Sequence, residues 1–271
     1  MASSSLSRVL CAAPLLLWAG AANANPRPLP FTYQHEQIAS GAAELEQYVD
    51  LTPIRARDAG SNTPLWYGLS QFTTEFEYGL TDRLELGLYV TYAPAASSGF
   101  AEIPRATNGN GLKQRLRFKL AETGEWPIDV SLYAEAAEDE RELELEAKVI
   151  LQRRLGLARI VADLSGEREF YYDGKHDIVL NPSAGLTFEV SPTIQPGIEW
   201  WMRAEYPEEG NVPRVFALGP HHYLGPTLLL QFGALWWTNG LYLRLNDRSH
   251  TQQIGEGFGS VWVRSMLGVE L

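Results

Sequence analysis

The chain has 271 residues, with 22 basic against 33 acidic side chains and a formal net charge of −11 at pH 7. This acidic balance argues against nucleic-acid binding, which needs a basic footprint. The mean hydropathy of −0.18 is too polar for a bundle of transmembrane helices, and no segment after the N-terminus approaches the roughly 18 apolar residues of one such helix.

The N-terminal residues have the features of a secretory signal. Arg8 is followed by an apolar run over 9–22, and Ala22-Asn23-Ala24 is the small-x-small pattern of a cleavage site. We therefore predict a signal peptide over 1–24. The only cysteine, Cys11, lies in this signal, so we expect no disulfide and no thiolate chemistry in the mature chain.

The next segment, 25–40, contains Pro26, Pro28 and Pro30 and shows neither strand nor helix periodicity. We predict an irregular periplasmic lead-in here, with a short plug as the alternative. The remaining residues, 41–271, form the predicted folded domain.

Short segments of alternating apolar and polar residues follow one another along this domain. The clearest is GLKQRLRFKL at 111–120, where every second residue is basic, as in a strand with two chemically opposite faces. Apolar runs at 228–230 and 236–237 break the alternation, so the faces of the strands near 221–245 stay unassigned. We predict about twelve strands, which lie near 42–52, 66–79, 84–93, 111–121, 127–137, 141–152, 157–169, 178–190, 194–206, 221–232, 234–245 and 258–271.

The connections between these strands alternate in length. Tight turns are expected at 81–83, 122–125, 153–156 and 191–193, whereas long segments rich in Gly, Pro and Asn occupy 53–65, 94–110, 170–177, 207–220 and 246–257. The segment at 138–140 is short where a long one is expected. Short turns on one side and long loops on the other are typical of outer-membrane barrels. The sequence therefore predicts an all-β fold, a single antiparallel transmembrane β-barrel over 41–271, with outer-membrane lipid and the barrel-assembly machinery as partners.

The charged faces of the strands predict the lumen. An Arg or Lys on the lipid face costs about 2–4 kcal/mol near the midplane, so the basic residues of 111–120 should point inward and pair with acids on neighbouring strands. An excess of acids in the lumen predicts a preference for cations. The candidate lumen-lining residues are Glu75, Glu77, Glu85, Lys113, Arg115, Arg117, Lys119, Asp129, Tyr133, Glu135, Glu142, Glu144, Glu146, Glu199, Trp201 and Arg203.

Three motifs resemble those of a known family. They are YGLTDRLELGLY at 78–89, LELEAK at 143–148 and LGVEL at 267–271. The chain resembles the proteobacterial, transporter-like outer-membrane β-barrels of the phenol-degradation-pathway (MetA-pathway) family. The resemblance implies the barrel fold, the outer-membrane location and a transport-like role, but it names no substrate.

Three functions follow from this interpretation. The first is a channel or transporter for a small-molecule solute, and the second is a non-conducting barrel with a structural or surface-interaction role and a lumen filled by ion pairs. The third is a membrane-embedded hydrolase, which the sequence disfavours because no serine lies in a Gly-x-Ser-x-Gly context. The five histidines also give no recognisable set of metal ligands. We therefore expect no catalytic, metal or cofactor site.

Overall fold

The structure is a computed structural model that describes residues 25–57, 64–92, 111–208, 218–246 and 259–271. The predicted signal over 1–24 lies outside these residues. None of the helices searched is long and apolar enough to cross a membrane. The strands of the described part are β1 (Ala43–Arg57), β2 (Pro64–Thr81), β3 (Leu84–Tyr92), β4 (Gly111–Lys119), β5 (Asp129–Asp139), β6 (Glu142–Leu155), β7 (Ala158–Tyr171), β8 (His176–Leu180), β9 (Ser183–Phe188), β10 (Ile194–Pro207), β11 (Leu218–Phe232), β12 (Leu235–Arg244) and β13 (Val261–Glu270).

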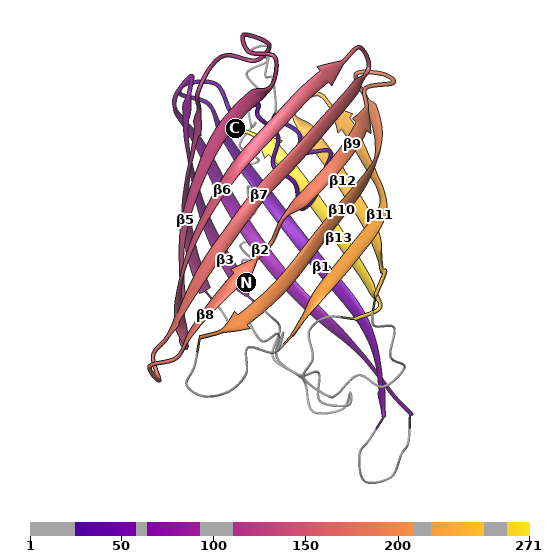
Figure 1. The fold of residues 1–271 in the computed structure, drawn as a ribbon. Coiled ribbons are helices and arrows are strands. Elements are labelled where there is room, and N and C mark those ends of the chain that lie inside the picture. Colours follow the sequence, from indigo (N-terminus) through magenta and orange to yellow (C-terminus); the bar gives the residue numbers. More distant parts are fainter. Residues whose placement is uncertain (1–24, 58–63, 93–110, 209–217, 247–258) are drawn as a thin grey trace, which may run out of the picture.

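These strands close into one antiparallel barrel (Figure 1). Consecutive strands pair with each other, except β8 with β9. β1 pairs with β13 from Glu44 against Glu270 to Leu51 against Val263, which closes the ring. The strands β8 and β9 share one position, because both pair with β7 on one side and β10 on the other. The predicted twelve-stranded barrel is therefore confirmed, with one strand divided in two.

The division falls at Asn181-Pro182, inside the segment predicted as one strand. Proline has no N–H to donate to the ladder, which interrupts pairing at this position. The carbonyl of Pro182 still accepts a hydrogen bond of 3.1 Å from the Met202 N–H. The Asn181 amide points inward and donates to Glu167 at 3.0 Å. The break thus places a polar amide on the inner face of the wall.

The connections after β2, β4, β6, β9 and β11 lie at one end of the barrel, together with the start of β1 and the end of β13 (Figure 1). The short connections between β5 and β6 and between β7 and β8 lie at the other end. Gly156 and Gly233 lie in the turns after β6 and β11 with φ of +62° and +65°, a conformation that glycine adopts without strain. At the other end β1 and β2 extend further than predicted, which shortens the expected loop at 53–65. The expected loop at 94–110 and most of those at 207–220 and 246–257 lie outside the described residues.

The burial pattern assigns the two faces of each strand. In β3, Leu88 and Val90 are exposed on the outside while Glu85 and Tyr89 are buried in the lumen. In β11 and β12, Leu229 and Trp236 point inward, and Leu228 and Trp237 point outward. The sequence could not assign these faces because apolar side chains are needed on both: Leu229 and Trp236 form part of an apolar cluster inside the barrel.

Residues 25–38, here called the lumenal segment, lie inside the barrel, where the sequence predicted a periplasmic lead-in with a plug as the alternative. Its side chains Leu29, Tyr33 and His35 are buried. Figure 1 shows this segment as an indigo thread within the ring of strands. The segment starts beside Glu44, at the beginning of β1, and reaches the level of Asp50 along the barrel axis. From there the chain runs back toward the beginning of β1. Six residues along a strand correspond to roughly 20 Å, or about 15 Å along a tilted barrel axis.

Candidate functional site

All of the candidate lumen-lining residues lie on the inner face of the barrel. Those of β2 and β3, with Arg115 and Arg117, surround the lumenal segment. A second group lines a cavity above the segment: Lys113, Tyr133, Glu135, Glu144, Glu146, Trp201 and Arg203. Glu199 binds the lumenal segment directly. Lys119 and Asp129 lie near the short turns, and Glu142 lies near the opposite rim, where Arg141 pairs with it at 3.2 Å.

A buried ion cluster occupies the lower lumen, by which we mean the part nearer the start of β1 and the tight turns; this end is drawn at the top of Figure 1. The cluster consists of Glu46, Glu75, Glu77 and Glu85 with Arg27, Arg115 and Arg117. Arg115 lies at its centre: its guanidinium is 2.8 Å from Glu75 and 2.5 Å from Glu85, and it also bonds Glu77. Arg117 holds the other oxygen of Glu85 at 2.8 Å. All of these side chains are fully buried. We call this group the lower cluster.

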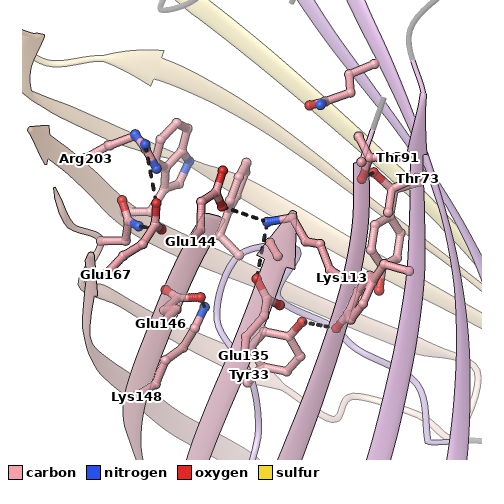
Figure 2. Close-up of a pocket in the computed structure, with 18 of the residues that line it drawn as sticks. Tyr33, Thr73, Thr91, Lys113, Glu135, Glu144, Glu146, Lys148, Glu167 and Arg203 are labelled. Atoms are coloured by element: carbon pink, nitrogen blue, oxygen red, sulfur yellow. Dashed lines mark hydrogen bonds and ion pairs between the residues drawn. The ribbon is translucent and has the colours of Figure 1, made fainter. Parts of the chain in front are cut away.

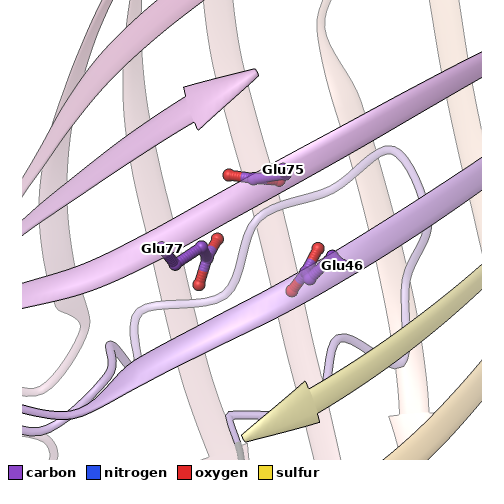
Figure 3. Close-up of side chains that lie close together, drawn as sticks. All are labelled: Glu46, Glu75 and Glu77. Atoms are coloured by element: carbon purple, nitrogen blue, oxygen red, sulfur yellow. The ribbon is translucent and has the colours of Figure 1, made fainter. Parts of the chain in front are cut away.

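Figure 3 shows Glu46, Glu75 and Glu77 of the lower cluster converging on the lumen from β1 and β2. Their carboxylate oxygens lie within 4.8 Å of one another, a spacing that suits a metal ion. Arg27 lies 3.5 Å from Glu46 and 3.6 Å from Glu75, and Arg115 lies against the other side of Glu75 and Glu77. Two guanidinium groups of the protein therefore already neutralise part of the negative charge of these three carboxylates.

Tyr33 spans the lumen just above the lower cluster. Its hydroxyl lies 2.8 Å from that of Tyr89 on β3, and its ring centroid lies 5.1 Å from that of Tyr133 on β5. The Arg27 guanidinium covers the same ring at 4.0 Å. Leu29 and Tyr33 pack with Tyr133, Ile150 and Val161 of β5, β6 and β7 into one apolar cluster, so the lumenal segment fills this part of the lumen.

A cavity of about 320 Å³, here called the vestibule, lies above the lumenal segment. Arg27, Phe31 and Tyr33 form its floor, and Gly111 and Asp139 lie in its rim at the end of the long connections. Figure 2 shows its two unlike walls. Thr73 and Thr91 present hydroxyls on one side, while the opposite side carries charged groups from β4, β5, β6, β7 and β10.

Ion pairs organise the charged wall of the vestibule (Figure 2). Lys113 lies 3.2 Å from Glu135 and 3.5 Å from Glu144, and Arg203 lies 2.6 Å from Glu169. Carboxylates nevertheless outnumber cations in the vestibule lining. The acids are Glu135, Glu138, Asp139, Glu144, Glu146, Glu167 and Glu205, and the bases are Arg27, Lys113, Lys148, Arg203 and Arg264.

Several lining residues escaped the sequence analysis. Lys148 lies two residues beyond Glu146 on the same face and pairs with it at 3.1 Å, so its alternation with Glu144 and Glu146 could have identified it. Glu167 faces Glu146 across the ladder between β6 and β7, which depends on register. The floor residues Arg27, Phe31 and Tyr33 had no signal, because the lumenal segment has no periodicity that links it to a strand.

Outside the membrane-spanning strands, a solvent-exposed ion pair joins the turn between β2 and β3 to the connection between β4 and β5. Arg83 lies 2.7 Å from Glu122, and both side chains are about half exposed. Hydrogen bonds from Arg83 and Lys119 lower the pKa of Glu122 below its usual value. This pair resembles those of the lower cluster in distance and differs from them in exposure to water.

A serine and a histidine do lie within hydrogen-bonding distance in the lumen. The His35 Nδ1 is 2.8 Å from the Ser131 Oγ. Both side chains are fully buried between the lumenal segment, to which His35 belongs, and β5, and neither lines the vestibule. A hydrolytic triad needs an accessible serine and an acid on the second imidazole nitrogen. This pair instead fastens the lumenal segment to β5.

Comparisons with known proteins support the fold. The COG4313 outer membrane channel from Pseudomonas putida F1 is 14% identical, with a TM-score of 0.58 over 88% of this chain and 98% of that chain. The NanC porin is 9% identical, with a TM-score of 0.56 over 84% of this chain and 100% of that one. The predicted fold of an outer-membrane barrel is thereby confirmed, whereas the resemblance to the MetA-pathway family is not.

No curated protein sequence matches the chain. A family model, however, matches residues 22–246, which are most of the chain. The protein therefore belongs to the family of unknown function DUF6662.

Proposed function

We propose that this protein lies in the outer membrane as a channel for small solutes and that its lumen favours cations. The observation that carries the proposal is the vestibule, a cavity inside the barrel in which carboxylates outnumber cations. At about 320 Å³ it lies at the lower end of the volumes of ligand pockets, about 300–1,000 Å³. Carboxylates in a narrow, weakly screened passage attract cations and repel anions.

The lumenal segment limits this function. Tyr33 and the lower cluster occupy the lumen below the vestibule, so the segment obstructs the route that a solute would take. This obstruction favours a second function, a non-conducting barrel with a structural or surface-interaction role. The buried ion pairs of Arg115 and Arg117 support it, because they hold the three neighbouring strands β2, β3 and β4 together inside the lumen.

Reversal potentials in planar bilayers under a KCl gradient test the channel. We expect the wild type to prefer K⁺, and we expect Glu144→Gln/Glu146→Gln to reduce this preference. The control is Glu122→Gln/Glu125→Gln, which removes the same charge from an exposed turn and should leave the preference unchanged. An anion-selective wild type would contradict the electrostatic argument. Absence of conductance, also after release of the lumenal segment, would establish the non-conducting alternative.

A further inference from the structure

We propose that the lower lumen is a binding site for an extended peptide and that the lumenal segment occupies this site in cis. The ligand class is a short, extended peptide with an arginine and, four residues later, an aromatic residue. Only the further step, that such a peptide is the cargo of the barrel, rests on the proposed channel function. The binding site itself is argued from contacts between the segment and the wall.

The wall recognises the main chain of the lumenal segment. One carboxylate oxygen of Glu199 accepts the N–H groups of Phe31 at 2.9 Å and Thr32 at 2.7 Å. Asp163 accepts the N–H of Tyr33 at 2.7 Å, and Glu85 accepts that of Ile38 at 3.0 Å. Main-chain groups are common to all peptides, so these contacts give affinity without requiring this one sequence.

Donors on the wall complete the recognition of the main chain. Thr238 donates to the carbonyl of Arg27 at 2.7 Å, and Arg117 donates to the carbonyl of Gln34 at 3.2 Å. Buried carboxylates of the wall thus accept hydrogen bonds from N–H groups of the segment, and buried donors of the wall donate to its carbonyl groups. Charge-assisted hydrogen bonds of this kind are stronger than neutral ones, and the groups come from strands on several sides of the barrel.

Two pockets recognise side chains of the segment. The Arg27 guanidinium lies between Glu46 and Glu75 and donates to the Tyr48 hydroxyl at 2.7 Å. Phe31 enters an aromatic pocket, where its ring stacks on Trp201 at a centroid distance of 4.3 Å. The edge of Tyr242 lies 5.2 Å away, and Arg264 covers the ring at 3.9 Å. These pockets are the source of the proposed arginine and aromatic preference.

A third contact shows that the wall is shaped for an occupant. Leu29 lies so close to Gly185 on β9 that a Cβ at this glycine would be 2.5 Å from the leucine Cδ1. Any larger residue at Gly185 would therefore force the Leu29 side chain to shift. The glycine leaves a recess in the wall, which this leucine fills.

The segment joins the barrel through an exposed tether. Ala39, Ser40 and Gly41 are exposed at the end of the short turns, and the Gly41 N–H bonds the Gly79 carbonyl at 2.8 Å. A tethered ligand has a high effective concentration, so a free peptide competes poorly until the tether is cut. Because none of the contacts that hold the main chain, Arg27, Leu29 or Phe31 of the segment involves 39–41, cleavage there leaves the site intact.

The test is exchange of the segment after cleavage. A protease recognition sequence inserted after Ser40 allows the folded barrel to be cut in detergent and then washed. The probe is a fluorescent peptide with the sequence of residues 25–40, and fluorescence anisotropy measures its binding. We expect saturable binding to the cut barrel and at least about tenfold weaker binding to the uncut one.

Substitutions in the peptide test the pockets without disturbing the fold of the barrel. Arg27→Ala and Phe31→Ala should each weaken binding by at least about tenfold, as hot-spot residues do. Ser40→Ala is the matched control and should bind like the parent peptide, since Ser40 is exposed. An unrelated extended peptide that keeps the arginine and the aromatic residue at this spacing should also bind.

Three outcomes would overturn the proposal: a cut segment that never exchanges with the probe, binding that ignores Arg27→Ala and Phe31→Ala, or a scrambled peptide that binds as well as the parent. Binding in detergent does not depend on conduction. A cut and washed barrel that binds the peptide but passes no ions would therefore refute the channel and leave the peptide site standing.

Discussion

Replacement of Arg115 by methionine should strongly destabilise the barrel. The Arg115 guanidinium is fully buried and pairs with Glu75 at 2.8 Å, with Glu85 at 2.5 Å and with Glu77. Methionine fills much of the same volume but carries no charge. The three carboxylates, which are themselves fully buried, would then lose their central cation.

The magnitude follows from burial. Removal of one partner from a buried ion pair costs about 3–5 kcal/mol, because the remaining charge stays desolvated without compensation. Arg83→Met is the matched control. Its pair with Glu122 has a similar distance, 2.7 Å, but the two side chains are 44% and 52% exposed, and such surface pairs contribute about 0–1 kcal/mol. We therefore expect a difference of roughly 3 kcal/mol between the two variants.

Urea unfolding of barrels refolded into lipid vesicles, followed by tryptophan fluorescence, measures both free energies of unfolding. Glu77→Gln added to Arg115→Met should restore part of the lost stability, since it removes one of the unpaired charges. Equal losses for Arg115→Met and Arg83→Met would refute the reasoning, because burial would then have no influence on the strength of these pairs.

Three further predictions concern the wall, the recess and the turns. Cysteine at Leu116 should react with a lipid-phase probe and cysteine at Arg117 should not, because these side chains lie on opposite faces of β4; the reverse labelling would reject the register. Gly185→Val should expel Leu29 and make the tether at 39–41 more sensitive to protease, whereas Gly166→Ala, whose Cβ would make only an ordinary contact of 3.8 Å, should not; equal protease sensitivity would argue against the recess. Gly156→Ala should lower the free energy of unfolding by about 1 kcal/mol in the same urea assay, because alanine resists the left-handed conformation; an unchanged value would contradict the strain argument.

The alternation of apolar and polar residues in the sequence was sufficient to predict much of the barrel. Side chains alternate strictly between the faces of a strand, and lipid accepts almost no charge, so a run such as Lys113, Arg115 and Arg117 can point only inward. The same reasoning placed the other candidates on the inner face and gave the number of strands to within one division. The division of one strand into β8 and β9 at Pro182 depends on the missing N–H of proline. The side chains of 178–190 alternate across this point, so the alternation did not reveal the division.

Other features depend on distant parts of the chain. The inward positions of Leu229 and Trp236 follow from an apolar cluster that combines β1, β3, β11, β12 and β13, and alternation cannot report such a cluster. The choice of ion-pair partners in the lower cluster depends on strand register. It also depends on Arg27, which belongs to the lumenal segment and not to a strand, and which contacts Glu46 and Glu75. The lumenal segment itself has no periodicity. Its place is decided by buried carboxylates and donors that come together only when the barrel closes, because these groups need partners away from water.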